Sequence, residues 1–206
     1  MLKLVIGDHN YSSWSLRPWL ALKQVGLPFE EISVRLRQAT TKTDILKYSP
    51  SAKVPCLIDG ETLVWESLAI CEYLAEMAPT LWPSERKARA EARAISSEMH
   101  SGFPSLRQEM PLDVCASLPY PPLSSEAKAD TARVIAIWED CRRRYGPKGP
   151  FLFGHFTNAD AMYAPVVFRF QTYCIELPEA SRRWSDTMLA LPAMQEWHQA
   201  TAAEPN

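Results

Sequence analysis

The sequence predicts an α/β unit followed by an all-helical unit. Residues 1–78 carry segments in the order β-α-β-α-β-β-α, judged from the spacing of their apolar residues. After them the composition changes at a proline-bracketed stretch, APTLWPSE, and the remaining segments have helical spacing. We therefore expect two packed domains, residues 1–78 and 85–206, joined by a linker at 79–84.

The first unit begins with a strand and a helix. Residues 2–6 (LKLVI) are apolar and rich in branched side chains, which is typical of a buried strand. The next apolar face has helical spacing and ends at Gly26. Because Pro18 is tolerated only in a first turn, we expect this helix to begin near Ser15. A half-buried strand is expected at 29–36, and a short helix follows in DILKYSP.

Residues 54–64 predict a β-hairpin, because two short apolar runs flank Asp59-Gly60, a dipeptide preferred in tight turns. Ser67 is a natural N-cap for the amphipathic helix that follows. The rest of the chain predicts helices, and FLFG at 151–154 is the one further candidate strand. The expected helical segments span 84–110, 124–145, 158–174, 179–190 and 192–203.

Composition and charge exclude several classes of protein. The chain has 206 residues, of which 47% are hydrophobic and 22% charged, as in globular rather than disordered proteins. Its formal charge of −2 provides no basic surface for nucleic acid. The longest apolar runs fall far short of the about 20 residues that span a membrane, and the first residues do not resemble a signal peptide. We expect neither nucleic acid nor a membrane as a partner.

The five cysteines indicate a reducing compartment. They are scattered, with no C-x-x-C pair and no Cys/His spacing of a zinc site. Cys71 and Cys141 lie in segments of helical spacing, where cysteine usually serves as a small core side chain. We therefore expect a cytoplasmic protein without a metal site.

A serine-rich segment, YSSWSLR at 11–17, follows the first strand. Hydroxyl and backbone N–H groups at a helix N-terminus stabilise an anion, because the helix dipole and the unpaired amides both point there. Ser12, Ser13 and Ser15 could equally serve only as helix caps. No G-x-S-x-G pattern surrounds them, so a hydrolase nucleophile is unsupported.

Two further features flank the expected hairpin. Val54-Pro55 precedes a strand, and a proline there leaves neighbouring backbone groups available to a ligand. Glu66 and Ser67 begin a helix, where Ser67 suits a carboxylate and Glu66 suits an ammonium group. The pair suits the zwitterionic end of an amino acid.

In this order and at this spacing, the motifs resemble those of the cytosolic glutathione S-transferases of the serine type, and especially a zeta-like bacterial member. YSSWSLRPWLAL looks like the family's glutathione-activating segment, and KVPCLIDGETLVWESLAICEYLAE looks like its cis-proline strand, hairpin and Glu-Ser helix. FTNADAMYAPVVF resembles the family's N-capping box, with Thr157 and Asp160 in its two positions. The resemblance covers most of the chain. It implies a thioredoxin-like first domain and an all-helical second domain that carries the electrophile site.

The resemblance assigns the sulfur of glutathione, the co-substrate, to a serine. Ser12 would donate a hydrogen bond to the sulfur and favour the thiolate, and Ser13 is its rival for this role. The pKa of the thiol would fall from about 8.5 by about one or two units, each equivalent to about 1.4 kcal/mol. Proximity of the thiolate to a bound electrophile would supply the rest of catalysis.

The resemblance assigns the other glutathione contacts to the hairpin region. Val54, beside a cis Pro55, would pair its backbone with the cysteinyl residue. Glu66 and Ser67 would hold the γ-glutamyl end. No metal is implied.

The chain departs from the zeta pattern at Trp14, which stands where that pattern has a cysteine. This substitution puts the zeta-type reaction, glutathione-dependent cis-trans isomerisation of maleylacetoacetate, in doubt. The helix expected to face the electrophile carries His100, Phe103 and Arg107, which could line that pocket with Trp14. His100 and Arg107 share one helical face if Pro104 does not break the helix, and they could equally form an ordinary interdomain pair.

These features favour a glutathione transferase that activates the thiol for attack on a small electrophile, as in detoxification. The alternatives are an isomerase of the maleylacetoacetate type and a non-catalytic module that binds glutathione or a protein. No cysteine lies in residues 8–20, which disfavours the thiol reductases of the superfamily. The resemblance also implies a homodimer.

Overall fold

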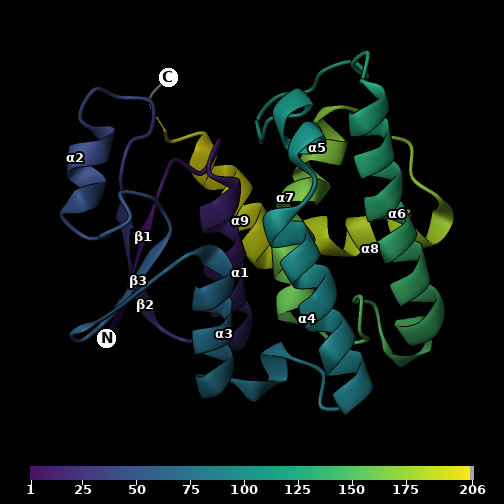
Figure 1. Ribbon diagram of the computed structural model, residues 1–206, viewed down its shortest axis with the longest axis horizontal. Coiled ribbons are helices and arrows are strands. Elements are labelled where there is room, and N and C mark those ends of the chain that lie inside the picture. The colour runs from purple at the N-terminus through teal and green to yellow at the C-terminus, as the bar shows by residue number, and fades with distance from the viewer. Residues whose placement is uncertain (205–206) are drawn as a thin grey trace.

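The computed structural model describes residues 1–204, and the last two residues of the predicted second domain, 205–206, lie outside the described part. Figure 1 shows a small sheet with its helices beside a larger group of helices. The first part contains β1 (Leu2–Ile6), α1 (Ser13–Val25), β2 (Phe29–Ser33), α2 (Thr41–Leu46), β3 (Cys56–Asp59), β4 (Thr62–Trp65) and α3 (Ser67–Met77). This is the predicted order β-α-β-α-β-β-α.

The sheet is mixed, with the strand order β2-β1-β3-β4. β1 pairs with β2 in parallel, whereas β3 pairs antiparallel with both β1 and β4. Alternate residues of β1 face opposite sides, as a strand's period of two requires. Leu4 and Ile6 pack into the large core with α1 and α3, and Val5 packs into a small core with Ile45 of α2. The sheet therefore lies between α2 on one face and α1 with α3 on the other (Figure 1).

The second part is helical. After the 3-10 turn η1 (Pro79–Leu81), it contains α4 (Arg86–Ser101), α5 (Pro104–Glu109), α6 (Ser125–Tyr145), the 3-10 turn η2 (Gly146–Lys148), α7 (Asn158–Thr172), α8 (Glu179–Leu189) and α9 (Pro192–Thr201). This part confirms the predicted all-helical unit. Within residues 1–204, no helix is long and apolar enough to cross a membrane.

The two parts share one hydrophobic core. α7 is buried along nearly its whole length and packs against α1, α4 and α8. The same cluster of buried side chains includes Leu4 of the sheet, Leu20 of α1 and Met162 of α7. Cys71 and Cys141 are buried in it, as predicted. Because α1 belongs to this shared core, its N-terminus is held firmly at the junction of the two parts.

The N-terminus of α7 carries the predicted capping box. Thr157 is the N-cap, its side chain is bonded to the N3 backbone, and the Asp160 carboxylate accepts the Thr157 backbone N–H at 2.8 Å. Asp160 also accepts the Leu152 N–H and the Trp184 indole N–H, each at 2.9 Å. The cap thus ties α7 to α8 and to the preceding loop.

Several expected helix ends were wrong. α1 begins at Ser13 rather than near Ser15, so Pro18 lies inside the helix and not in its first turn. Glu66 is the N-cap of α3, and the expected N-cap Ser67 is its first helical residue. The expected helix 84–110 is divided into α4 and α5, because Phe103 adopts a left-handed conformation with φ 58° and Pro104 then begins a new helix.

The expected strands also differ in detail. The strand expected at 29–36 ends at Ser33. In the hairpin Asp59 pairs with Thr62, so Gly60 and Glu61 form the turn instead of Asp59-Gly60. Gly60 has a φ of 58°, which explains its place there. The candidate strand FLFG contributes only isolated bridges around Phe151 and Gly154.

Candidate active site

Three segments of the first part meet around one cavity of about 220 Å³. They are the first turn of α1, the loop that leads into β3, and the junction of β4 with α3. The residues that line it are Trp14, Lys53, Val54, Pro55, Glu66 and Ser67. The structure thus brings together three residues predicted to bind glutathione, Val54, Glu66 and Ser67. The predicted structural residue Pro55 and the predicted pocket residue Trp14 line the same cavity.

The β4–α3 side of this cavity has an unsatisfied hydroxyl group. The Ser67 side chain is 1% exposed, and its Oγ has no hydrogen-bond partner among residues 1–204. Ser67 is also the first residue of α3, where backbone N–H groups lack helical acceptors. An orphaned buried hydroxyl at a helix N-terminus suits a carboxylate. The neighbouring Glu66 carboxylate is half exposed and suits an ammonium group.

The β3 side of the cavity presents Val54 and Pro55. The peptide bond between them is cis, as the resemblance implies. Lys53, which precedes them, also lines the cavity. Sequence reasoning missed Lys53, although its place beside Val54-Pro55 was a signal that could have found it.

Ser12 and Ser13 lie at the N-terminus of α1 but are not among the residues that line this cavity. Ser12 is the N-cap residue and is 4% exposed, yet its side chain makes no capping hydrogen bond. Its Oγ instead donates to the Ser15 Oγ at 2.7 Å. The Ser13 hydroxyl makes no hydrogen bond to any described residue. A role limited to helix capping therefore does not describe Ser12.

Trp14 is surrounded by cationic side chains. The Arg17 guanidinium lies 4.2 Å from the centroid of the indole ring, and the Arg107 guanidinium lies 5.5 Å from it. The His100 ring meets the indole edge-on, with 5.3 Å between centroids. Trp14 is half-buried, so it is a wall of the cavity rather than a core side chain.

Arg17 is a buried charge without a hydrogen-bond partner. It is 1% exposed, and no described residue accepts its Nε or Nη1. Burial, together with the nearby charge of Arg107, lowers the pKa of Arg17 to about 9. Burial likewise lowers the pKa of Arg169 on α7 to about 10. Sequence reasoning missed Arg169, because only the tertiary fold brings it to this region.

His100 lies between Trp14, with its neighbouring arginines Arg17 and Arg107, and Glu66 of the predicted glutathione site. Its Nε2 lies 3.7 Å from the Glu66 Oε2, and its Nδ1 has no hydrogen-bond partner among residues 1–204. Burial lowers the pKa of His100, and Arg17 lowers it further. His100 and Arg107 both reach Trp14 even though the helix breaks between them. Phe103, at that break, is buried in the main core.

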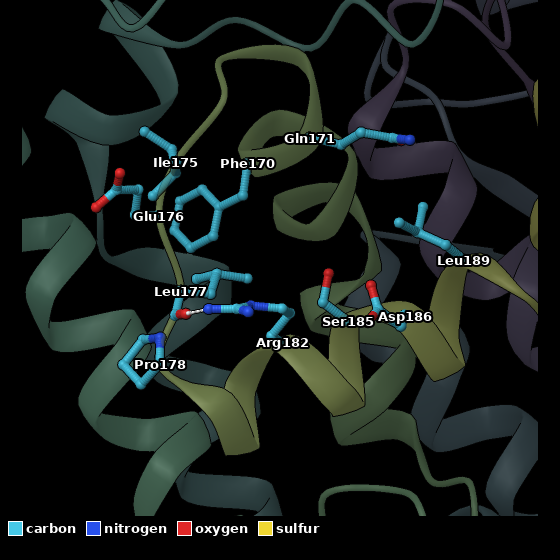
Figure 2. Close-up of a pocket in the computed structure, with 10 residues that line it drawn as sticks. All are labelled: Phe170, Gln171, Ile175, Glu176, Leu177, Pro178, Arg182, Ser185, Asp186 and Leu189. Carbon is cyan, nitrogen blue, oxygen red and sulfur yellow. Dashed lines mark hydrogen bonds between the residues drawn. The ribbon is translucent and has the colours of Figure 1, made fainter.

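A larger cavity, of about 850 Å³, lies elsewhere. Figure 2 shows it between the end of α7, the following loop and α8, with side chains from Phe170 to Leu189. None of the predicted site residues lines it. Its one arginine, Arg182, donates to the Leu177 carbonyl at 2.9 Å. The described part of the chain also contains no cluster of three His, Cys, Asp or Glu side chains that could hold a metal.

Comparisons with known proteins match both halves of the chain. The family model of the glutathione S-transferase N-terminal domain matches residues 11–77, and that of the C-terminal domain matches residues 121–200. A probable maleylacetoacetate isomerase from Caenorhabditis elegans is 38% identical over 96 residues, which are 46% of this chain and 44% of that protein. A maleylacetoacetate isomerase from Mus musculus is 40% identical over 103 residues, which are 46% and 45% of the two chains. The chain thus spans less than half the length of these curated relatives.

A solved structure supports the fold over the whole chain. The holo structure of a maleyl pyruvate isomerase, described as a bacterial zeta-class glutathione S-transferase, superposes with a TM-score of 0.75. It covers 99% of each chain at 23% identity. The architecture of this solved structure, the two matching domain models and the mixed sheet of the first part all indicate the same fold. The chain belongs to the glutathione S-transferase family.

Proposed function

We propose that this protein is a glutathione transferase in which Ser12 stabilises the glutathione thiolate for attack on a small electrophile. The observation that carries the proposal is the 220 Å³ cavity where Val54, Glu66 and Ser67 meet. Its chemistry matches the γ-glutamyl and cysteinyl parts of glutathione, and it lies beside the N-terminus of α1.

The γ-glutamyl end would bind at the start of α3. Its carboxylate would accept hydrogen bonds from the Ser67 hydroxyl and from an unpaired N–H of the first helical turn. Its ammonium group would lie against the Glu66 carboxylate. The orphaned Ser67 Oγ supports this arrangement, because a bound carboxylate would satisfy it. The Val54 backbone would pair with the cysteinyl residue, which directs its sulfur toward α1.

The sulfur would then meet the N-terminus of α1. A hydrogen bond from the Ser12 hydroxyl and the positive end of the helix dipole both favour the thiolate over the thiol. One hydrogen bond to a charged acceptor contributes about 1.5–3 kcal/mol, or about a tenfold to hundredfold change in thiolate population. Ser13 remains the alternative donor.

The electrophile would bind on the far side of Trp14. Trp14, His100 and Arg107 would form that side, and Phe103 would support it from the core. The indole ring lines the glutathione cavity and also contacts His100 and Arg107, so it would set the width of the electrophile pocket.

A second candidate function is a glutathione-dependent isomerisation of the maleylacetoacetate type. The two curated relatives carry that activity in their names. The specific observation in its favour is the group of Arg17, Arg107 and Arg169, none of which forms an ion pair with a carboxylate in the described residues. An unpaired cationic group suits an electrophile that carries a carboxylate.

The proposal includes a homodimer in the cytoplasm. Leu63 and Trp65 of the edge strand β4, with Met77 at the end of α3, are large apolar side chains that are more than two-fifths exposed. A second copy of the chain would cover them. The five cysteines are all free, which suits a reducing cytoplasm. Light scattering should give about twice the monomer mass of 23.3 kDa, and Trp65→Glu should lower it.

The test of the glutathione site is calorimetric titration of the full chain with glutathione. We expect Ser67→Ala to weaken binding about tenfold to a hundredfold, because a hydrogen bond to a charged group is lost. Ser97→Ala, on an exposed face of α4, is the matched control and should bind as the parent does. A parent protein that does not bind glutathione would overturn the proposal. Binding without turnover of chlorodinitrobenzene or a maleylacetoacetate analogue would identify a non-catalytic module.

A further inference from the structure

We propose that Ser15 is a positioning residue that aims the Ser12 hydroxyl at the glutathione sulfur. This inference rests on the proposed function, because it concerns how the same thiolate is stabilised. Its starting point is that the Ser12 hydroxyl does not cap α1 although Ser12 occupies the N-cap position. That hydroxyl is bonded to Ser15 instead, at 2.7 Å.

Ser15 is held in place by the chain before the helix. It is fully buried, and its Oγ accepts the Gly7 backbone N–H at 3.1 Å. Gly7 directly follows β1, so the bond ties the first turn of α1 to the end of the central strand. A side chain at position 7 would collide with Leu36, whose nearest atom would lie 2.6 Å from the added Cβ. Full burial and the hydrogen bond from Gly7 therefore hold the Ser15 oxygen beside the end of β1.

The hydrogen bonds leave one hydroxyl hydrogen unused. The Ser15 Oγ accepts from both Gly7 and Ser12, and the Ser15 hydroxyl donates to no described residue. Ser12, in contrast, uses its only hydrogen on Ser15. The hydrogen of the Ser12 hydroxyl is thus used within the pair.

A bound thiolate would reverse this pair. If both hydroxyl groups rotate, the Ser15 hydroxyl donates to the Ser12 Oγ, and the Ser12 hydroxyl becomes free to donate to the sulfur. The resulting chain runs from the Gly7 N–H to Ser15, from Ser15 to Ser12 and from Ser12 to the thiolate. Each hydroxyl then donates one hydrogen bond and accepts one, and successive bonds of one direction polarise each other. The thiol proton leaves to water, and no proton is transferred between the serines.

To stabilise the thiolate, the hydrogen of the Ser12 hydroxyl must point at the sulfur, and Ser12 alone does not fix that direction. A serine whose oxygen accepts no hydrogen bond is free to rotate, so it loses rotational entropy when it binds the sulfur. A serine whose oxygen accepts from Ser15 has its remaining hydrogen directed toward one acceptor. Ser15 therefore acts on the thiolate through Ser12, without touching glutathione.

The experiment compares the pKa of the bound glutathione thiol, measured by ultraviolet thiolate absorbance against pH, in the full-length variants. Ser12→Ala should raise the thiol pKa by about one to two units. Ser15→Ala should raise it by about half a unit to one unit, which is about three- to tenfold less thiolate at neutral pH. Ser15→Thr retains a hydroxyl and should restore the parent value. Ser97→Ala, on an exposed face of α4, is the matched control and should leave the thiol pKa at the parent value.

A second ligand separates positioning from folding. S-methylglutathione has no ionisable thiol, so its affinity should be the same in Ser15→Ala and in the parent. If Ser15→Ala does not fold, Ser15→Cys keeps a side chain of the same shape, slightly larger and with a much weaker donor, and carries the same expectation. A shift in Ser12→Ala without a shift in Ser15→Ala or Ser15→Cys would overturn the role of Ser15. An unshifted thiol pKa in Ser12→Ala would overturn the assignment of Ser12 in the proposed function.

Discussion

The guanidinium of Arg17 lies 4.2 Å from the centre of the Trp14 indole. Trp14 precedes Arg17 by three residues in α1. Arg17 has no hydrogen bond from its Nε or Nη1, so this cation–π contact is the main compensation for its burial. The contact also fixes the indole as a wall of the cavity beside Ser67. One pair of side chains thus links the stability of α1 to the shape of the site.

Trp14→Cys should therefore change stability and substrate choice together. Loss of the aromatic face should reduce the free energy of unfolding by about 0.5–2 kcal/mol, because Arg17 then has no partner. The smaller side chain should also raise kcat/KM for a bulky electrophile relative to a small one. Thermal melting and kinetics with both electrophiles are measured on the same variant.

Trp14→Phe is the control for this prediction. Phenylalanine keeps a π face for Arg17, so most of the stability should remain while the pocket widens. If Trp14→Cys melts as the parent does, the contact with Arg17 does not contribute to stability. If the ratio of kcat/KM values is unchanged in both variants, Trp14 does not limit the electrophile.

Asp160→Ala should lower stability and leave glutathione affinity intact in the folded fraction. The fully buried Asp160 carboxylate accepts the backbone N–H groups of Leu152 and Thr157 and the indole N–H of Trp184. Its removal leaves these three donors without an acceptor, at about 1–3 kcal/mol for each donor that stays unsatisfied. Chemical denaturation measures the loss. Asp160→Asn keeps one acceptor oxygen, so it should lower the free energy of unfolding less than Asp160→Ala does. An unchanged free energy of unfolding in Asp160→Ala would contradict this account.

The contact of Asp160 with Thr157 could be predicted from the sequence, whereas its contact with Trp184 could not. Thr157 and Asp160 lie three residues apart, so the capping box was predicted from local spacing. Trp184 lies on another helix, and only tertiary packing brings it to Asp160. The same distinction applies to the site: Val54, Glu66 and Ser67 lie in short motifs that were recognised, whereas Arg169 reaches the region of Arg17 through the fold alone.

The wrong helix ends have a related cause. The spacing of apolar residues over 84–110 predicted one helix, although Pro104 was recognised as a possible break and does begin α5. The break depends on the left-handed backbone of Phe103, which its burial in the shared core stabilises. Such a conformation is uncommon for phenylalanine and is selected by tertiary contacts rather than by local preference.

His9 should make the stability of the loop before α1 depend on pH. Burial by itself would lower the pKa of His9, but hydrogen bonds to Glu31 and Glu204 outweigh it and raise the pKa above 6.5. A raised folded-state pKa contributes stability that is fully present below 6.5 and is lost as the pH rises through the folded value. The melting temperature of the parent should therefore decrease over that interval.

His9→Asn should remove this part of the pH dependence, and Glu204→Gln should reduce it. The pKa of His100 is lowered, so its titration lies below the same interval and does not obscure the result. The His9 ring also packs at a tilt against Trp197, with 4.4 Å between centroids, so the melting temperature of each variant is compared with its own value at low pH. A parent and a His9→Asn variant with parallel pH profiles would rule out the linkage.

Arg107→Gln should distinguish an acidic electrophile from a neutral one. The Arg107 guanidinium lies 5.5 Å from the Trp14 ring centroid, forms no ion pair within residues 1–204, and donates to the Gly102 carbonyl. Burial lowers the pKa of Arg107, and an arginine guanidinium is not deprotonated in proteins. A carboxylate on the electrophile would gain a charge-assisted hydrogen bond of about 1.5–3 kcal/mol from it. Loss of that bond should raise KM for a maleylacetoacetate analogue about tenfold to a hundredfold.

The matched control for Arg107→Gln is Arg133→Gln on α6, which removes an exposed arginine bonded to Glu98 at 2.7 Å. Arg133→Gln should leave both substrates unaffected, because it changes the protein's charge equally but away from Trp14. Chlorodinitrobenzene has no carboxylate, so its KM should change little in Arg107→Gln. Equal losses with both substrates would mean that Arg107 supports the fold at the α4–α5 break. An unchanged KM for the maleylacetoacetate analogue would mean that the arginines around Trp14 do not bind the electrophile. The proposed isomerase function would then lose the observation that favours it.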